Sequence, residues 1–268
     1  MSDPLPEDLS RALAASAARR GCFGDPVYFF SETGSTNDVA ASLAERDAPE
    51  GATVVASSQT AGRGRFGRTW FSPPGAGLYV SVVCRNPSAA PFVTLAGGVA
   101  VADGIRAASG LPVQIKWPND IVVEGVAPAR RRKLAGILAE ASTGAAGLQY
   151  VILGFGINLR PAAYPPELAD RATALETELG RPADGAAVLA ETLAVFADLF
   201  KGLATGHSER VLVRWRELAP SSRGARVEWD TPDGVVAGVS VGIADDGALL
   251  VRVRDHIERI ISGELRWI

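Results

Sequence analysis

The hydrophobic and polar positions along the chain follow two periodicities. Short runs rich in valine, isoleucine and aromatic residues, of which 78–84 is the strongest, are typical of β-strands. Longer stretches place small and apolar residues at helical spacing, as residues 92–109 do. Strands are predicted at 27–30, 53–58, 78–84, 113–116, 121–123, 133–140 and 150–159, and helices at 7–20, 37–46, 92–109, 173–180, 185–204 and 208–218.

The pattern changes after Pro220. From residue 225 onward it contains only short alternating strands separated by turns rich in Asp and Gly, which is typical of a small all-β barrel of roughly 45 residues. We therefore expect an α+β protein with an N-terminal helix or tail (1–22), a main domain (23–220) and a C-terminal β-barrel domain (221–268). The barrel strands are predicted at 226–229, 235–243, 248–254 and 256–262.

Composition limits the class of protein. The chain has 268 residues, and 47% of them are hydrophobic, which is ample for a core. A net charge of −3 and a pI of about 5.5 give no overall basic field for nucleic acid. The acidic N-terminus lacks the apolar segment of a signal peptide, and no run of 18 apolar residues occurs. We expect a cytoplasmic protein that binds neither DNA nor a membrane.

Cysteine and histidine are scarce. Cys22 and Cys84 fit neither a metal-site spacing nor a disulfide framework, and Cys84 lies in an apolar run, where we expect a buried thiol. His207 and His256 are the only histidines, which disfavours a multi-histidine metal site or a histidine base.

The most unusual stretch is a loop in which glycine and arginine interleave. Gly62, Gly64 and Gly67 alternate with Arg63, Arg65 and Arg68. Glycine lets the backbone approach a ligand closely, and successive backbone N–H groups can form an anion-binding nest. Arginine adds a fork of donors that suits phosphate or carboxylate. The sequence therefore predicts a mobile loop that closes over an anion, the alternative being an exposed solvated basic loop.

The three glycines also satisfy the dinucleotide-binding pattern G-x-G-x-x-G. That pattern requires a strand before it and a helix after it. Here Pro73, Pro74 and Gly75 follow the loop, and they interrupt any helix. We therefore reject a Rossmann fold.

A second polar segment precedes the helix predicted at 37–46. Ser35 or Thr36 is a natural N-cap for this helix. The two hydroxyl groups would serve as a cap alone, or would also face a ligand at the helix N-terminus.

Three further segments have an ordinary structural interpretation, and two of them also have a functional alternative. Lys116-Trp117-Pro118-Asn119-Asp120 joins two predicted strands, as a simple Pro-Asn-Asp turn would. Gly154 and Gly156 lie two residues apart, hence on one face of a strand, and indicate either a β-bulge or a flat floor for a ring. The consecutive arginines 130–132 are best interpreted as a solvated basic loop, with steering of an acidic partner as the alternative.

Taken together, five motifs resemble those of biotin protein ligases. They occur in the order that the family has, over residues 34–158, and the C-terminal barrel extends the similarity. The motifs are Gly34-Ser35-Thr36-Asn37, Gln59-Thr60-Ala61-Gly62-Arg63-Gly64-Arg65, Lys116-Trp117-Pro118-Asn119-Asp120, Lys133-Leu134-Ala135-Gly136-Ile137-Leu138 and Gly154-Phe155-Gly156-Ile157-Asn158.

The resemblance implies a mixed β-sheet backed by helices, like that of class II aminoacyl-tRNA synthetases, followed by an SH3-like barrel. It also implies a two-step reaction within the main, catalytic domain. Biotin and ATP give biotinyl-5′-AMP and pyrophosphate, with Mg²⁺ accompanying ATP, and a lysine of a biotin carboxyl carrier protein then takes the biotinyl group.

The resemblance implies roles for individual residues. Lys133, Arg65 and Asp120 are the candidate catalytic residues; for Asp120, holding Mg²⁺ and acting on the carrier lysine both remain open. The candidate biotin contacts are Ser35, Thr36, Asn37, Gln59, Gly62, Arg63, Trp70, Gly136, Gly154 and Gly156, in which the glycines form a floor and Trp70 a wall. The candidate ATP contacts are Arg63, Arg65, Arg68, Trp70, Asn119, Lys133 and Asn158.

Two departures from the family pattern concern regulation and loop closure. Regulatory members carry an N-terminal winged helix-turn-helix, and the roughly two dozen residues before the first strand are too few for it. We therefore expect a monofunctional ligase, of undetermined oligomeric state. Phe66 stands where the family often has a basic residue, with an effect on closure that the sequence leaves open.

Two other functions compete with the biotin ligase. A lipoate–protein ligase or octanoyltransferase shares the fold, but its substrate has no ureido group for Ser35, Thr36 and Gln59 to bind. A non-enzymatic binding module has no need of Lys133 and three loop arginines aimed at a reacting phosphate.

Overall fold

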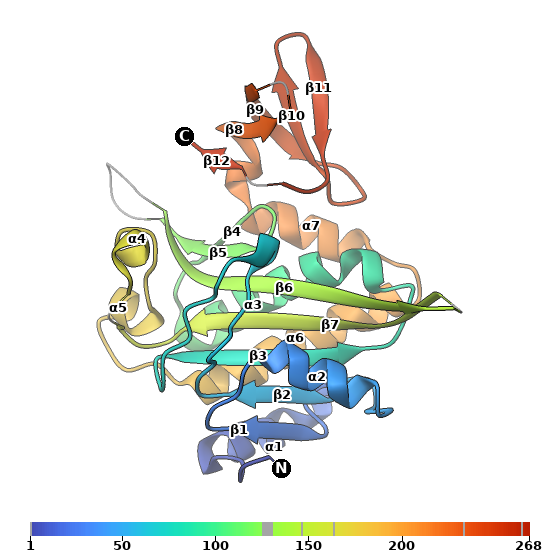
Figure 1. The fold of residues 1–268 in the computed structure, drawn as a ribbon, viewed down its shortest axis with the longest axis vertical. Coiled ribbons are helices and arrows are strands. Elements are labelled where there is room, and N and C mark those ends of the chain that lie inside the picture. The colour runs from blue at the N-terminus through green and yellow to red at the C-terminus, as the bar shows by residue number, and fades with distance from the viewer. Residues whose placement is uncertain (1, 125–130, 146, 163, 233, 264) are drawn as a thin grey trace.

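The computed structural model describes residues 2–124, 131–145, 147–162, 164–232, 234–263 and 265–268. Its centre is a seven-stranded sheet with the order β1-β2-β3-β7-β6-β5-β4, in which β1 and β2 are parallel and the other pairs antiparallel (Figure 1). The mixed sheet confirms the predicted fold class. The strands are β1 (Val27–Phe30), β2 (Thr53–Ala56), β3 (Gly77–Cys84), β4 (Gln114–Lys116), β5 (Asp120–Val123), β6 (Arg132–Gly144) and β7 (Gly147–Asn158).

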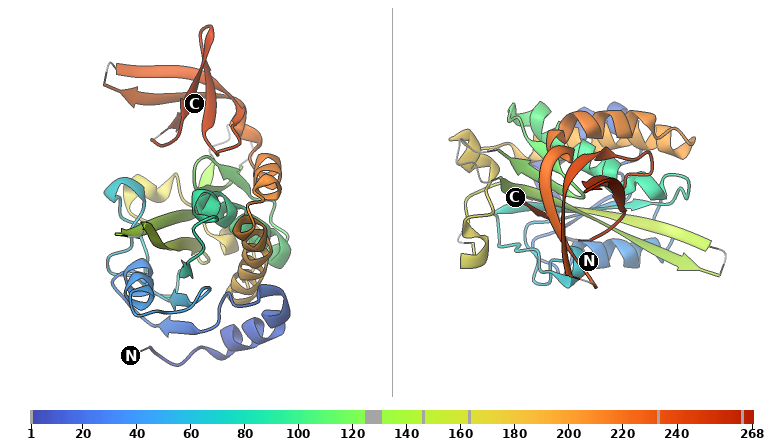
Figure 2. Two further views of the ribbon diagram at one scale, coloured as in Figure 1. Left: turned by 90° about the vertical axis from the view of Figure 1, so that its right-hand side faces the viewer. Right: turned by 90° about the horizontal axis from the view of Figure 1, so that it is seen from above.

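Helices cover both faces of this sheet (Figure 2). On one face α3 packs against α6, α7 and the sheet, and α1 packs against α6. On the other face α2 packs against β2, β3 and β7, over a smaller core that includes Ala40, Val54 and Ile152. The helices are α1 (Glu7–Arg20), α2 (Thr36–Ala44), α3 (Val93–Ser109), α4 (Pro166–Ala169), α5 (Leu175–Leu179), α6 (Gly185–Ala204) and α7 (Glu209–Leu218), with short 3₁₀ turns at Arg65–Gly67, Ala90–Phe92 and Pro220–Ser222.

The helix α3 is buried because its residues are small enough for close packing. A Cβ on Gly104 would lie 2.7 Å from the backbone nitrogen of Thr192 in α6, so only glycine allows the two helices to come this close. By length and composition alone, Ala90–Ser109 would pass for a membrane span, with a mean hydropathy of 1.2. However, 61% of that window is buried inside the protein, as in a core helix.

The C-terminal residues form a five-stranded antiparallel sheet with the order β11-β10-β9-β8-β12. Among the described residues, no pairing joins β11 to β12, so the sheet is consistent with an SH3-like domain without closing into a full barrel. The predicted domain boundaries remain a prediction, although the change from helix to strand falls between Leu218 and Arg223. The strands are β8 (Arg223–Thr231), β9 (Gly234–Ile243), β10 (Leu249–Val253), β11 (His256–Ile260) and β12 (Arg266–Trp267).

The C-terminal sheet is bonded to the turn between β4 and β5. The indole Nε1 of Trp117 donates a hydrogen bond of 3.0 Å to the carbonyl of Gly247. Arg216, at the end of α7, donates to the carbonyl of Ile243 and pairs with Asp245. The Lys-Trp-Pro-Asn-Asp turn therefore connects the central sheet to the C-terminal sheet, in addition to being a candidate site segment.

The sheet edge formed by β1 is partly covered by the N-terminus. Asp3 forms an antiparallel bridge with Phe29, and its carboxylate accepts hydrogen bonds from the backbone and hydroxyl of Ser31. As expected from the sequence, Cys84 is buried, and it is the last residue of β3, which lies between β2 and β7.

Candidate active site

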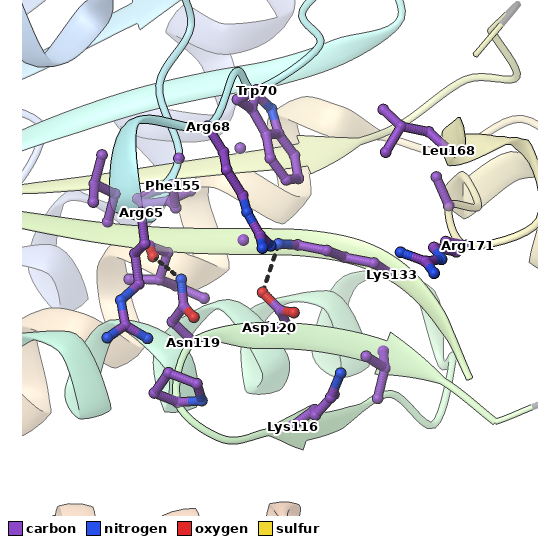
Figure 3. A pocket seen from close by; sticks show the side chains of 18 of the residues that line it. Arg65, Arg68, Trp70, Lys116, Asn119, Asp120, Lys133, Phe155, Leu168 and Arg171 are labelled. Carbon is purple, nitrogen blue, oxygen red and sulfur yellow. Dashed lines mark hydrogen bonds and ion pairs between the residues drawn. The ribbon is translucent and has the colours of Figure 1, made fainter. Parts of the chain in front are cut away.

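A cavity of about 960 Å³ lies beside the central sheet, between the Gly/Arg loop, the β4–β5 turn and the C-terminal residues (Figure 3). It brings together predicted site residues that are more than 120 positions apart in the sequence. Gly62 is not among its lining residues and lies against the Trp70 carbonyl and Ser72 Oγ. The predicted residues that line the cavity are Ser35, Thr36, Asn37, Gln59, Arg63, Arg65, Arg68, Trp70, Asn119, Asp120, Lys133, Gly136, Gly154, Gly156 and Asn158.

Lys133 occupies the middle of the cavity (Figure 3). Its Nζ lies 2.5 Å from Oδ1 of Asp120 and 5.1 Å from the centre of the Trp70 ring. The backbone holds the lysine from two sides: it pairs with Val122 in β5, and its N–H donates to the carbonyl of Arg171. A charged amine held at the start of a strand in this way is suited to stabilising charge on a reacting phosphate.

Further cations surround Lys133. Burial lowers the pKa of Lys116; Asp120 opposes this effect, and Lys133, Arg131 and Arg171 reinforce it. Burial also lowers the pKa of Arg65. The charged side chains that line the described cavity wall include only three carboxylates, those of Asp120, Glu124 and Asp170, against eight cations. The cavity is therefore suited to a polyanion, although the whole chain is acidic. The eight cations are Arg63, Arg65, Arg68, Lys116, Arg131, Lys133, Arg171 and Arg266.

At the other side of the cavity the N-terminus of α2 is capped in an unexpected way. Ser35 is the N-cap residue, but its side chain makes no capping hydrogen bond. Instead, Gln59 Oε1 accepts from the backbone N–H of Thr36 at 2.8 Å, and Gln59 Nε2 donates to Ser72 at 3.0 Å. Because Gln59 caps the helix, the Ser35 hydroxyl is not used as a cap, which favours the ligand-facing interpretation of this segment.

The hydroxyl groups near this cap have spare acceptor capacity. Ser81 Oγ lies 2.5 Å from Oδ1 of Asn37 and 2.8 Å from Oγ1 of Thr36, which in turn lies 3.1 Å from Oε1 of Gln59. Only the hydroxyl groups of Ser81 and Thr36 can supply protons to these three oxygen–oxygen contacts, because the amide oxygens of Asn37 and Gln59 only accept. Two protons therefore serve three contacts. A ligand that donates N–H groups therefore complements this end of the cavity better than one that only accepts.

The three glycines for which a floor was predicted, Gly136, Gly154 and Gly156, line the cavity between its two ends. Gly136 in β6 is paired with Gly156 in β7, and a Cβ on Gly154 would lie 2.2 Å from Oδ1 of Asn37. Trp70 differs from the predicted wall, because its ring lies on the floor: a Cβ on Gly156 would lie 2.3 Å from its Nε1. That buried Nε1 has no hydrogen-bond partner within the described part of the chain.

Arg63 lines the cavity but is bound by two carboxylates. It binds both carboxylate oxygens of Asp38, at 2.6 and 2.7 Å, and Oε2 of Glu140 at 3.0 Å. Arg65 stacks on Phe66 instead, 4.8 Å from the ring centre, and Phe66 itself is 62% exposed with a φ of 58°. All three interleaved arginines therefore line the cavity, and Arg63 in addition anchors the loop to α2 and β6.

Asn119 and Asn158 are both held by backbone hydrogen bonds. Asn119 Nδ2 donates to the carbonyl of Ile137 at 2.6 Å, and Asn158 Nδ2 donates to the carbonyl of Thr173 at 3.0 Å. The second bond positions the segment that includes Arg171. These asparagines therefore shape the cavity through the backbone that they hold.

Sequence reasoning missed part of the lining. The segment 164–172 contributes Tyr164, Leu168 and Arg171, and its helix α4 has only four residues, too few for a periodic signal. The C-terminal residues 265–268 also line the cavity, and Arg131 lies 6.0 Å from the Trp267 ring.

The basic residues 130–132 were predicted to form a solvated loop. Arg130 lies outside the described residues. Arg131 pairs with Glu124 at 2.9 Å and Arg132 with Glu178 at 2.7 Å, so these two arginines have structural partners.

A divalent cation has limited ligands from this chain. The described residues contain no cluster of three or more His, Cys, Asp or Glu side chains suited to a metal. Of the three carboxylates that line the described cavity wall, the one of Asp120 lies beside Lys133. Mg²⁺ in nucleotide sites is usually held by one or two carboxylates together with phosphates. The donor set therefore fits Mg²⁺ that arrives with a nucleotide.

Comparison with known proteins agrees with this geometry. Residues 29–158 match the biotin/lipoate A/B protein ligase family, and residues 224–265 match the biotin protein ligase C terminal domain. The bifunctional ligase/repressor BirA of Bacillus subtilis is 34% identical over 97% of this chain and 79% of its own length. The biotin–[acetyl-CoA-carboxylase] ligase of Mycobacterium tuberculosis is 32% identical over 88% of this chain and 86% of its own length.

A solved structure is similar over nearly the whole chain. The biotin protein ligase from Aquifex aeolicus in complex with biotin and ATP has a TM-score of 0.76 and 28% identity, and the match covers 90% of this chain and 98% of that one. With both its main part and its C-terminal part matched, the chain belongs to the biotin protein ligase family.

Proposed function

We propose that this protein is an ATP-dependent ligase that attaches biotin to a biotin carboxyl carrier protein. The carboxylate of biotin attacks the α-phosphate of ATP, which forms biotinyl-5′-AMP and releases pyrophosphate. The ε-amine of a carrier lysine then attacks the carbonyl of this mixed anhydride, an amide bond forms, and AMP leaves. We place this reaction in the cytoplasm. The proposal includes no DNA binding and no particular oligomeric state.

The observation that carries the proposal is the polarity of the cavity. One end is rich in cations around Lys133, and the other end is rich in oxygen acceptors around Thr36, while glycines form the floor between them. A ligand with an N–H-donating ring at one end and a carboxylate at the other fits this arrangement. Biotin has that shape, and the carboxylate end would meet the phosphates of ATP at the lysine.

The cations have distinct parts in the first step. Lys133 would bridge the biotin carboxylate and the α-phosphate, and would offset the charge that develops between them. Arg65 and Arg68 would cover the phosphates from the loop, and closure of the loop would keep water from the adenylate. Lys116 would add charge from the β4–β5 turn. Mg²⁺ bound by the phosphates, with Asp120 as the available protein ligand, would neutralise further phosphate charge.

Asp120 has two candidate roles, which separate experimentally. A carboxylate that binds Mg²⁺ is needed for adenylation, whereas one that orients or deprotonates the carrier lysine is needed only for transfer. Asp120→Asn should therefore slow ATP–pyrophosphate exchange in the first case. In the second case exchange persists, and transfer from preformed adenylate falls.

Lipoate is the alternative acid substrate for this fold. Its dithiolane ring has no N–H group and would leave the spare acceptor capacity around Gln59, Thr36 and Asn37 unused. We therefore favour biotin.

ATP–pyrophosphate exchange with purified protein tests the proposal, with biotin or lipoate as the only acid. Exchange that requires biotin and Mg²⁺ supports a biotin ligase. Exchange with lipoate keeps the adenylation chemistry but contradicts the choice of acid. A folded protein that exchanges with neither acid would contradict the enzymatic proposal in favour of a binding module.

A further inference from the structure

Glu140 belongs to the strand that carries Lys133 but has no part in the proposed chemistry. Glu140 and Gly136 are four residues apart on β6, so they lie on the same face of the strand. This is the face of the sheet that α2 covers. Oε2 of Glu140 accepts one hydrogen bond from Nδ2 of Asn37, at 2.5 Å, and another from Arg63, at 3.0 Å. One carboxylate oxygen thus contacts both a side chain that lines the cavity, Asn37, and the Gly/Arg loop.

The contact with Asn37 fixes the orientation of its amide. A carboxylate only accepts hydrogen bonds, so the NH₂ group of Asn37 must face Glu140 and its oxygen must face Ser81. Asn37 is 5% exposed, and it lies so close to Gly154 that a Cβ there would come within 2.2 Å of the amide oxygen. The amide therefore has one orientation, with its oxygen facing the acceptor-rich end of the cavity.

The contact with Arg63 ties the loop to the same carboxylate. One terminal nitrogen of the Arg63 guanidinium, Nη1, donates to Asp38 on α2, and the other terminal nitrogen, Nη2, donates to Glu140 on β6. Arg63 is thereby held between the helix and the sheet, at the base of the loop that includes Arg65. A substitution of Glu140 would therefore affect the Asn37 side chain and the loop together.

We propose that Glu140 is a positioning residue for biotin, which sets the Asn37 amide toward the ring and anchors the base of the loop through Arg63. The inference rests on the proposed function. It differs from an ordinary surface ion pair, which contributes little, because Glu140 also contacts a buried residue that lines the cavity.

The chain offers a matched control in Asp38. Both carboxylates pair with Arg63, but the Asp38 side chain is 62% exposed and the Glu140 side chain 41%, and only Glu140 is bonded to Asn37. Asp38→Asn therefore removes an Arg63 pair alone. Glu140→Gln keeps the size and an acceptor for Asn37 but loses the charge, and Glu140→Ala removes both contacts.

The test is biotin-dependent ATP–pyrophosphate exchange, with the biotin Kd measured separately by isothermal titration calorimetry. We expect Glu140→Ala to raise the biotin KM and Kd about ten-fold, as loss of a charge-assisted hydrogen bond would. The KM for ATP should stay unchanged. Glu140→Gln should recover most of the biotin affinity, and Asp38→Asn, which loses an Arg63 pair but leaves the Asn37 bond intact, should have a clearly smaller effect than Glu140→Ala.

Three results would overturn the inference while the unsubstituted protein stays active. Equal effects of Glu140→Ala and Asp38→Asn would reduce Glu140 to an ion-pair partner. Equal increases in KM for biotin and ATP would indicate a general loosening of the site. A Glu140→Gln variant whose biotin affinity is as low as that of Glu140→Ala would contradict the role of the Asn37 bond. An unsubstituted protein that binds biotin without exchange would instead contradict only the proposed function.

Discussion

The ammonium of Lys133 and the carboxylate of Asp120 form an ion pair of 2.5 Å at the centre of the cavity. The two residues lie on neighbouring strands, β6 and β5, so the sheet itself fixes the pair. A phosphate that binds Lys133 must share it with Asp120 or displace the carboxylate. The pair therefore holds the lysine side chain next to the position where we place the α-phosphate.

Lys133→Ala should slow adenylation strongly but spare biotin binding, because the lysine acts on charge that develops during the reaction. Loss of one such group typically costs about 10²–10³-fold in rate. Exchange kinetics and a biotin Kd from calorimetry would measure the two effects. Lys201→Ala, at an exposed position of α6, is the control. A biotin affinity that falls as far as the rate would show that the role is wrong.

Arg65→Gly should release the adenylate prematurely. The Arg65 side chain lines the cavity and is partly buried, which lowers its pKa, and its loss would open the site to water. We expect about ten-fold faster escape of biotinyl-5′-AMP, as for one lost charged hydrogen bond. Chromatography of the released adenylate, or biotinylation of a bystander protein, would report the escape. Arg65→Lys keeps the charge and tests the fork geometry; an escape rate that Arg65→Gly leaves unchanged would count against loop closure by this residue.

Gly154→Ala should weaken biotin binding through the floor. The added methyl group would meet Asn37 Oδ1 at 2.2 Å, so the amide must move, at a cost of about 1–3 kcal/mol for overpacking. The biotin KM in the exchange assay should rise about ten-fold or more. Gly98→Ala is the matched control, since its Cβ would meet Ile115 at 3.7 Å, an ordinary contact. Similar kinetics for both variants would contradict a tight floor.

The affinity for ATP should fall at alkaline pH because of Lys116. Burial lowers the pKa of Lys116 below the ordinary lysine value of 10.5, so its positive charge is lost at a lower pH than usual. The charge is present at neutral pH and disappears as the pH rises through this pKa, and the KM for ATP should increase there. Lys116→Arg should move the increase to higher pH, because a guanidinium stays protonated. A profile that is the same in both proteins would exclude Lys116 as its source.

The elements with strong local patterns were predictable from the sequence. The helices α3 and α6 are long and periodic, and the strands β3 and β7 are continuous apolar runs, so their positions were right to within a few residues. The short α4 and the two-residue β12 were missed, because neither is long enough to show a period. Strand β6 runs four residues beyond the predicted end, since pairing with β7 extends past the apolar run.

The site was predictable where residue type reveals function and less so where orientation matters. The Gly/Arg loop, Lys133 and Asp120 lie together as expected, since glycine, arginine and charged turn residues have few structural reasons to cluster. The direction of Arg63 depends on Asp38 and Glu140, and Glu140 is 77 residues away in the sequence. The position of Trp70 on the floor likewise depends on tertiary packing, which a linear pattern does not contain.

The two chain ends lie far apart: the N-terminal end lies beside β1, and the C-terminal end lies beside β12 (Figure 1). Ile268 lines the cavity, whereas Asp3 is fastened to the β1 edge. For anyone producing the protein, this decides where an affinity tag or a surface linker belongs. A peptide fused after Ile268 would emerge from the wall of the cavity and obstruct an incoming carrier protein. Attached before Asp3, the same peptide would leave the entrance clear.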